Sequence, residues 1–182
     1  NTMLNRFIAS YANEAVAGMG IAKRIDLMAF AVAQGMAQGT LPLIGYNFTS
    51  GNRARMRSAI RTLLLYCILV SCTVTAGLYL AAVPVTKLFI NDAATASFGT
   101  LFLRIICLAC PTTSLNIFVI TVFQATGKKL PPIFLSLLRK GSLDVALMAV
   151  LDRTAGIRGV AWASPIADAA ALVISGVMLL CY

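Results

Sequence analysis

Residues 31–61 read AVAQGMAQGTLPLIGYNFTSGNRARMRSAIR, and this stretch decides the fold. An uncharged apolar segment, rich in small residues, passes Pro42 and a turn at Gly51 and Asn52 and then meets four arginines. Membrane proteins keep Lys and Arg on the cytoplasmic side of the bilayer. The stretch therefore predicts a membrane helix that ends on the cytoplasmic side.

The composition of the whole chain also indicates an integral membrane protein. Of its 182 residues, 59% are hydrophobic and 12% are charged, and the mean hydropathy is +0.87. A soluble domain is about one quarter charged, so this chain has too few charges to cover a globule with polar surface. The net charge of +9 lies in short clusters beside apolar runs. We therefore expect the lipid bilayer, and no nucleic acid, as the partner of the basic residues.

The chain carries no motif for enzyme chemistry. It has no histidine, no HExxH or GxSxG motif and no phosphate-binding glycine loop, and its six acidic residues are scattered. Five cysteines lie inside apolar segments. Cys107 and Cys110 have CxxC spacing, but without a second such pair we interpret them as small hydrophobic residues. We expect no enzyme, no cofactor and no metal site.

The hydrophobic pattern predicts an all-α membrane bundle. The uncharged runs at 27–52, 62–86 and 105–127 can each hold the roughly 20 residues that a crossing helix needs. With two further apolar segments, we predict five complete transmembrane helices, at 16–44, 60–83, 97–125, 131–151 and 157–181. Residues 1–12 read as the end of a sixth. We expect residues 1–182 to form one transmembrane lobe of a longer protein.

The basic residues predict the orientation of this bundle. The loops at 45–58 and 126–130 carry arginines and lysines, whereas the loop at 91–97 carries none. The bias places the first two loops in the cytoplasm. Because consecutive helices alternate in direction, we expect a multi-pass protein of the cell (cytoplasmic) membrane with a cytoplasmic C-terminus.

Polar residues form a slowly drifting stripe on the first predicted helix, at spacings of three or four residues. The stripe consists of Lys23, Asp26, Phe30, Gln34 and Gln38. A polar stripe on an apolar helix is typical of a solvated pathway, and the alternative is an interface in which Gln side chains bond a neighbouring helix. Lys23, Arg24 and Asp26 can instead lie at the outer interface, where their side chains reach the headgroups.

Three later helices add further polar candidates. In 97–125, Asn116 belongs to a polar series with Arg104, Thr112 and Gln124, and Pro111 predicts a bend or an exposed carbonyl. Lys140 and Asp144 are four residues apart, which favours an intrahelical ion pair, and Asp168 is an intramembrane carboxylate. The predicted substrate and ion pathway comprises Lys23, Arg24, Asp26, Gln34, Gln38, Asn116, Asp144 and Asp168.

Four segments resemble the C-terminal half of a MATE (multidrug and toxic compound extrusion) transporter. They are AKRID at 22–26, GMAQGTLPLIGYNF at 35–48, LSLLR at 135–139 and GVAWASPIAD at 159–168, in matching order and spacing. The resemblance implies two six-helix lobes around a central cavity, of which this chain holds the second. The sodium-binding members have acidic residues in helices seven and ten, and the segment 97–125, which corresponds to helix ten, has none.

The resemblance implies export of small organic cations across the membrane by alternating access, in exchange for H⁺ or Na⁺. We expect H⁺ slightly more than Na⁺, and we expect the N-terminal lobe of the same protein as a partner. Two alternatives stay open: a related exporter or flippase of lipid-linked sugars, and a membrane remnant that transports nothing.

Overall fold

The computed structural model describes residues 13–89, 92–128, 130–137 and 143–180. This part of the chain contains helices and no strand, which confirms the all-α prediction. Its elements are α2 (Asn13–Thr49), α3 (Arg53–Leu80), α4 (Ala82–Phe89), α5 (Ala93–Cys107), α6 (Cys110–Ala125), α7 (Leu130–Leu137) and α8 (Asp144–Leu180).

Helices α2 and α3 form a long hairpin with a turn much shorter than the predicted loop 45–58. Helix α2 continues through Gly45 to Thr49 because polar side chains in its last turns bond back to it; Asn47 Nδ2, for example, donates to the Leu43 carbonyl at 2.8 Å. Gly51 adopts a positive φ of 73°, and the side chain of Asn52 then accepts from the backbone N–H of Arg55 at 3.1 Å. This N-cap starts α3 at the first arginine.

The predicted helix 97–125 is two helices, α5 and α6, bent by 41° at Leu108 and Ala109. Pro111 explains the break because it has no N–H to donate to the carbonyl of Cys107, one turn earlier. That carbonyl accepts instead from the hydroxyl of Thr75 on α3, at 3.1 Å. A neighbouring helix thus replaces the bond that proline removes.

Helix α8 consists of two arms joined at Gly156, whose φ of 58° and ψ of −144° are not helical. The break agrees with the boundary predicted between the helices at 131–151 and 157–181, but the segment predicted as one helix at 131–151 contains two elements, α7 and the first arm of α8. Helix α7 begins at Leu130, directly before Pro131 and Pro132, and proline suits the first turn of a helix. Residues 138–142, with Lys140, lie outside the described residues, so the predicted pair between Lys140 and Asp144 stays a prediction.

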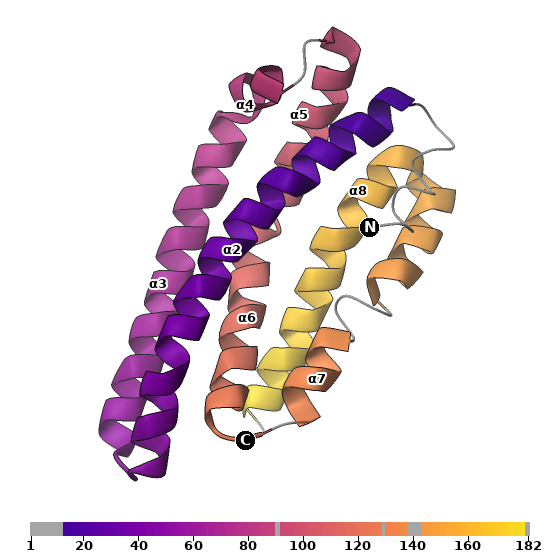
Figure 1. The fold of residues 1–182 in the computed structure, drawn as a ribbon. Coiled ribbons are helices and arrows are strands. Elements are labelled where there is room, and N and C mark those ends of the chain that lie inside the picture. The colour runs from indigo at the N-terminus through magenta and orange to yellow at the C-terminus, as the bar shows by residue number, and fades with distance from the viewer. Residues whose placement is uncertain (1–12, 90–91, 129, 138–142, 181–182) are drawn as a thin grey trace.

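The helices pack around α6, which lies between α3 and α8 and is covered by α2. Figure 1 shows the α2–α3 turn, the α6–α7 turn and the last turn of α8 at one end of the bundle. Helix α4 and the start of α5 lie at the other end. The arginines of α3 and Lys128 therefore share one end, as the pattern of loops predicted.

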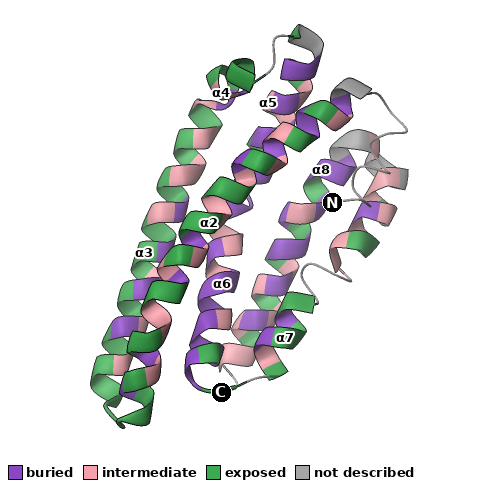
Figure 2. Cartoon of the chain, viewed as in Figure 1, coloured by how far each residue is buried: buried purple, intermediate pink, exposed green. Residues whose placement is uncertain are grey.

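Many large apolar residues lie on the outer surface, as a helical membrane bundle requires, and Figure 2 shows how exposed residues follow the outer sides of the helices. Leu65, Leu69 and Val173 are each more than half exposed, and large exposed patches of this kind mark contact with lipid or with a partner. Within the described ranges, two helices are long and apolar enough to cross a membrane, Arg53–Leu80 and Gly159–Leu179, and the bent pair α5–α6 adds a third. The count of five crossings stays a prediction.

Candidate ion and substrate pathway

A polar cavity of about 110 Å³ lies where the break between α5 and α6 faces α2 and α8. Its polar lining consists of Lys23, Asp26, Thr113, Ser164 and Asp168. Two carboxylates and one amine therefore meet at the level of the helix break. Three residues of the predicted pathway, from segments 140 residues apart, line this one space.

Asp168 is the most constrained of these residues. It is 6% exposed, and the hydroxyl of Thr113 on α6 donates to its carboxylate. Asn116, also on α6, donates from Nδ2 to the Asp168 backbone carbonyl at 2.8 Å, and Ser175 donates to Asn116 Oδ1 at 3.2 Å. These bonds hold the Asp168 backbone and carboxylate against α6, and they leave the side chain bordering the cavity.

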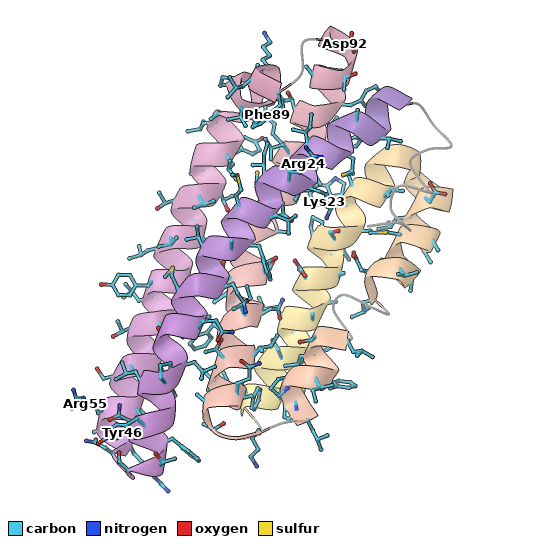
Figure 3. The ribbon with its side chains drawn as sticks, in the orientation of Figure 1. Lys23, Arg24, Tyr46, Arg55, Phe89 and Asp92 are labelled. Atoms are coloured by element: carbon cyan, nitrogen blue, oxygen red, sulfur yellow. The ribbon has the colours of Figure 1, made fainter. Side chains whose placement is uncertain are left out.

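A second chain of hydrogen bonds joins α2 to both arms of α8. Lys23 Nζ donates to Ser164 Oγ at 3.2 Å, and Ser164 Oγ donates to Asp144 Oδ1 at 3.2 Å. Ser164 lies after the Gly156 break and Asp144 lies before it. Ser164 thus connects two residues of the predicted pathway, Lys23 and Asp144, that are far apart in the sequence. Figure 3 shows Lys23 on the side of α2 that faces α8.

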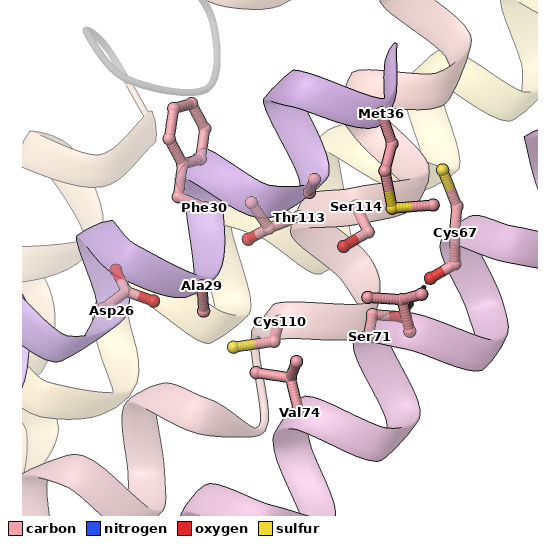
Figure 4. Close-up of a pocket in the computed structure, with 12 residues that line it drawn as sticks. Asp26, Ala29, Phe30, Met36, Cys67, Ser71, Val74, Cys110, Thr113 and Ser114 are labelled. Carbon is pink, nitrogen blue, oxygen red and sulfur yellow. Dashed lines mark hydrogen bonds between the residues drawn. The ribbon is translucent and has the colours of Figure 1, made fainter. Parts of the chain in front are cut away.

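Two further spaces adjoin this cavity. Figure 4 shows residues that line the first, a small void of about 20 Å³ toward α3, among them Asp26, Ser71 and Cys110. The second, about 260 Å³, lies toward α7 and has Gln34 and Gln124 in its lining. Phe30 borders all three spaces. The part of the stripe from Lys23 to Gln34 therefore borders neighbouring spaces along α2 that share lining residues.

Three cysteines agree with the interpretation as buried small hydrophobic residues: Cys67, Cys107 and Cys110 are buried and free. Cys72 is free but exposed, and Cys181 lies outside the described residues. Cys107 is the last residue of α5 and Cys110 is the first residue of α6, so their CxxC spacing is the spacing of the break between these helices. Within the part of the chain that the structure describes, no three His, Cys, Asp or Glu side chains gather as a metal site would need.

The structure separates the predicted residues into three groups. Lys23, Asp26 and Asp168 line the polar cavity, and Asn116 and Asp144 are linked to it by hydrogen bonds. Gln34 lines the neighbouring space. Arg24 and Gln38 are exposed and are not among the residues that line these three spaces. The role of each residue in transport stays a prediction.

No role was assigned to Thr113, Ser164 or Ser175 from the sequence. The series through Thr112 assumed an unbroken helix, but Thr112 bonds its own helix at the Ala109 carbonyl while Thr113 faces Asp168. Residues 113 and 116 are one turn apart on α6. Counting the period from Pro111 would have placed Thr113 and Asn116 on one face.

The sequence of the chain is similar to that of a known multidrug export protein. The chain is 26% identical over 166 residues to the multidrug export protein MepA of Staphylococcus saprophyticus, an alignment that covers 91% of this chain and 36% of that protein. The chain thus spans about a third of the length of this relative.

Solved structures show the same fold. A multidrug resistance MATE family transporter in an outward-facing conformation matches with a TM-score of 0.88 at 21% identity, over 97% of this chain and 40% of that one. An inward-facing structure of such a transporter matches with a TM-score of 0.88 at 21% identity, over 97% and 41%. The family model MatE matches residues 1–150. Because this match covers most of the chain, and because the fold agrees with it, the chain belongs to the MatE family.

Proposed function

We propose that this chain is the C-terminal lobe of a cation-coupled antiporter that exports small organic cations by alternating access. The observation that carries the proposal is the polar cavity at the α5–α6 break, where Asp26 and Asp168 face one space with Lys23. Charged groups inside a membrane are costly, so they mark ion or substrate paths by default.

The charge of the cavity favours a cation as its ligand. With all three groups ionised, two carboxylates and one ammonium leave one net negative charge. A proton, a sodium ion or the positive centre of an organic cation would neutralise it. A lipid-linked sugar carries phosphates and would need a cationic cavity, so the lining supports drug export over the flippase alternative.

Alternating access requires a lobe that keeps its fold while the transporter changes its opening. The equal TM-scores with an outward-facing and an inward-facing relative support a lobe of this kind. The bonds from Lys23 through Ser164 to Asp144 and from Thr113 to Asp168 tie α2, α6 and both arms of α8 together. We infer that the lobe moves as one body against its N-terminal partner.

The coupling ion is part of the same proposal, with H⁺ slightly favoured over Na⁺. The hydroxyl of Thr113 donates to Asp168, and the hydroxyl of Ser164 donates to Asp144. Hydroxyl groups bonded to acids in this way suit the transfer of a proton. The orientation follows from the arginines of α3: the α2–α3 end faces the cytoplasm, in the cytoplasmic membrane.

The test uses the intact transporter that contains this chain, reconstituted in liposomes and driven by a proton gradient or a sodium gradient. Uptake of a fluorescent organic cation is measured for Asp168→Asn and Asp26→Asn, with Asp152→Asn as the charge-matched control outside the cavity. We expect at least a tenfold loss in the first two and a wild-type rate in the control. Wild-type transport by both cavity variants would refute the proposal, and the effective gradient identifies the ion.

A further inference from the structure

A groove of about 700 Å³ lies between α4, α5 and α8, separate from the polar cavity. Lys87 of α4 and Arg104 of α5 line it together with the hydroxyl residues Ser97 and Thr100. Among the described residues of its lining, none is acidic. The groove therefore presents two cations and two hydroxyl groups, without an opposite charge of its own.

Arg104 is costly at this position without an anion. It lies about three turns beyond the N-cap of α5 at Asp92, or roughly 18 Å along a helix, within a 30 Å hydrocarbon layer. Its side chain is exposed, and the contact that the structure gives its guanidinium is the ring of Tyr79, at 5.3 Å. A cation–π contact offsets part of the cost of a desolvated charge. An anion supplied from the surroundings would offset the rest.

The remaining walls suit a hydrocarbon chain. Val83, Leu101 and Ile105 line the groove, and Trp162 of α8, which is 43% exposed, closes one side. Next to the groove, Leu88 and Phe89 at the end of α4 are 81% and 61% exposed (Figure 3). Tryptophan and short helices with exposed apolar residues are typical of the membrane–water interface. The groove thus runs from Lys87 on α4 to Arg104, about three turns along α5, and the long side chain of Arg104 can reach back toward the headgroup level.

We propose that this groove binds an anionic glycerophospholipid from the leaflet opposite the α2–α3 end. The phosphate lies between Lys87 and Arg104, and an acyl chain lies along Leu101 and Ile105. A volume of this size holds a headgroup and the upper part of a chain. The site is independent of the transported substrate and of the coupling ion.

Native mass spectrometry of the intact transporter, with phosphatidylglycerol and phosphatidylcholine in equal amounts, tests the proposal. One basic residue near a membrane surface contributes about fivefold to the binding of an anionic lipid, so Arg104→Gln and Lys87→Gln should each lose about fivefold, and the double variant about thirtyfold. Arg104→Lys keeps the charge and should retain most of the binding. Val83→Trp fills the groove without a change of charge and should also reduce binding.

Arg57→Gln on α3 is the matched control, because it removes an exposed arginine at the other end of the bundle. Retention of phosphatidylglycerol by the double variant at the wild-type level would overturn the proposal, and so would an equal loss in Arg57→Gln. Displacement of the lipid by millimolar inorganic phosphate would also overturn it, because the groove would then bind phosphate without the chains.

Discussion

Thr113 donates its hydroxyl hydrogen to the carboxylate of Asp168, and this bond joins the first turn of α6 to the second arm of α8. Its position follows from Pro111, which starts α6 at a new angle and turns Thr113 toward α8. The helix break at Pro111 thus brings the hydroxyl of Thr113 within bonding distance of the Asp168 carboxylate on another helix.

The first prediction concerns this pair. Thr113→Val keeps the shape of the side chain and removes the donor, so a buried charge loses a hydrogen bond worth about 1.5–3 kcal/mol. We expect a lower unfolding temperature of the purified transporter and slower cation transport. Thr112→Val is the control, since Thr112 bonds a carbonyl of its own helix. Equal effects of the two changes would contradict the assignment.

The second prediction concerns the crossing of α2 and α5. A Cβ at Gly18 would lie 2.8 Å from the backbone nitrogen of Gly99, so Gly18→Ala forces the two helices apart, at a cost of about 1–3 kcal/mol. Gly20, in the same helix, has no atom within 4 Å of such a Cβ. We expect Gly20→Ala to be neutral or slightly stabilising. Thermal unfolding of both variants decides the point, and a stable Gly18→Ala protein would disprove the close contact.

The third prediction concerns the Cys107 carbonyl at the helix break. Thr75→Val removes the hydroxyl that donates to this carbonyl and should destabilise the protein by about 1–3 kcal/mol. Pro111→Ala restores a backbone donor for the same carbonyl. The double variant should therefore be more stable than the sum of the single changes predicts. Additive unfolding free energies would show that the two residues do not share this acceptor.

The fourth prediction uses cysteine labelling in a background without native cysteines. Asp26 and Gln34 line neighbouring spaces, so Asp26→Cys and Gln34→Cys should react with a water-soluble thiol reagent in membranes. Val32 is 48% exposed on the apolar side of α2, and Val32→Cys should stay inert because it faces lipid. Equal inertness at all three positions would refute a solvated pathway. Gln38→Cys extends the test toward the α2–α3 end.

The sequence allowed the helical bundle, the shared end of the basic turns and part of the site to be predicted. Length and periodicity along one helix are local properties, so the stripe through Lys23, Asp26 and Gln34 was visible without coordinates. Asp168 was recognised because a carboxylate in an apolar run is rare. Its partners were not, because the match between Thr113 and Asp168 depends on how α6 and α8 pack.

The error in the first loop has a local cause. The loop predicted at 45–58 is mostly helix, because the side chains of Asn47 and Thr49, residues typical of turns, bond back to α2. The bend expected at Pro111 in the helix predicted at 97–125 is confirmed. The donor to the carbonyl that Pro111 leaves without a helical partner could not be predicted, because Thr75 is more than thirty residues away.

Phe30 separates three small spaces that a single aromatic ring can merge or divide. Its ring borders the cavity of Asp26 and Asp168, the void toward α3 and the opening beside Gln34. A smaller side chain at position 30 would leave these spaces less separated, so the size of one residue on α2 affects the surroundings of both acids.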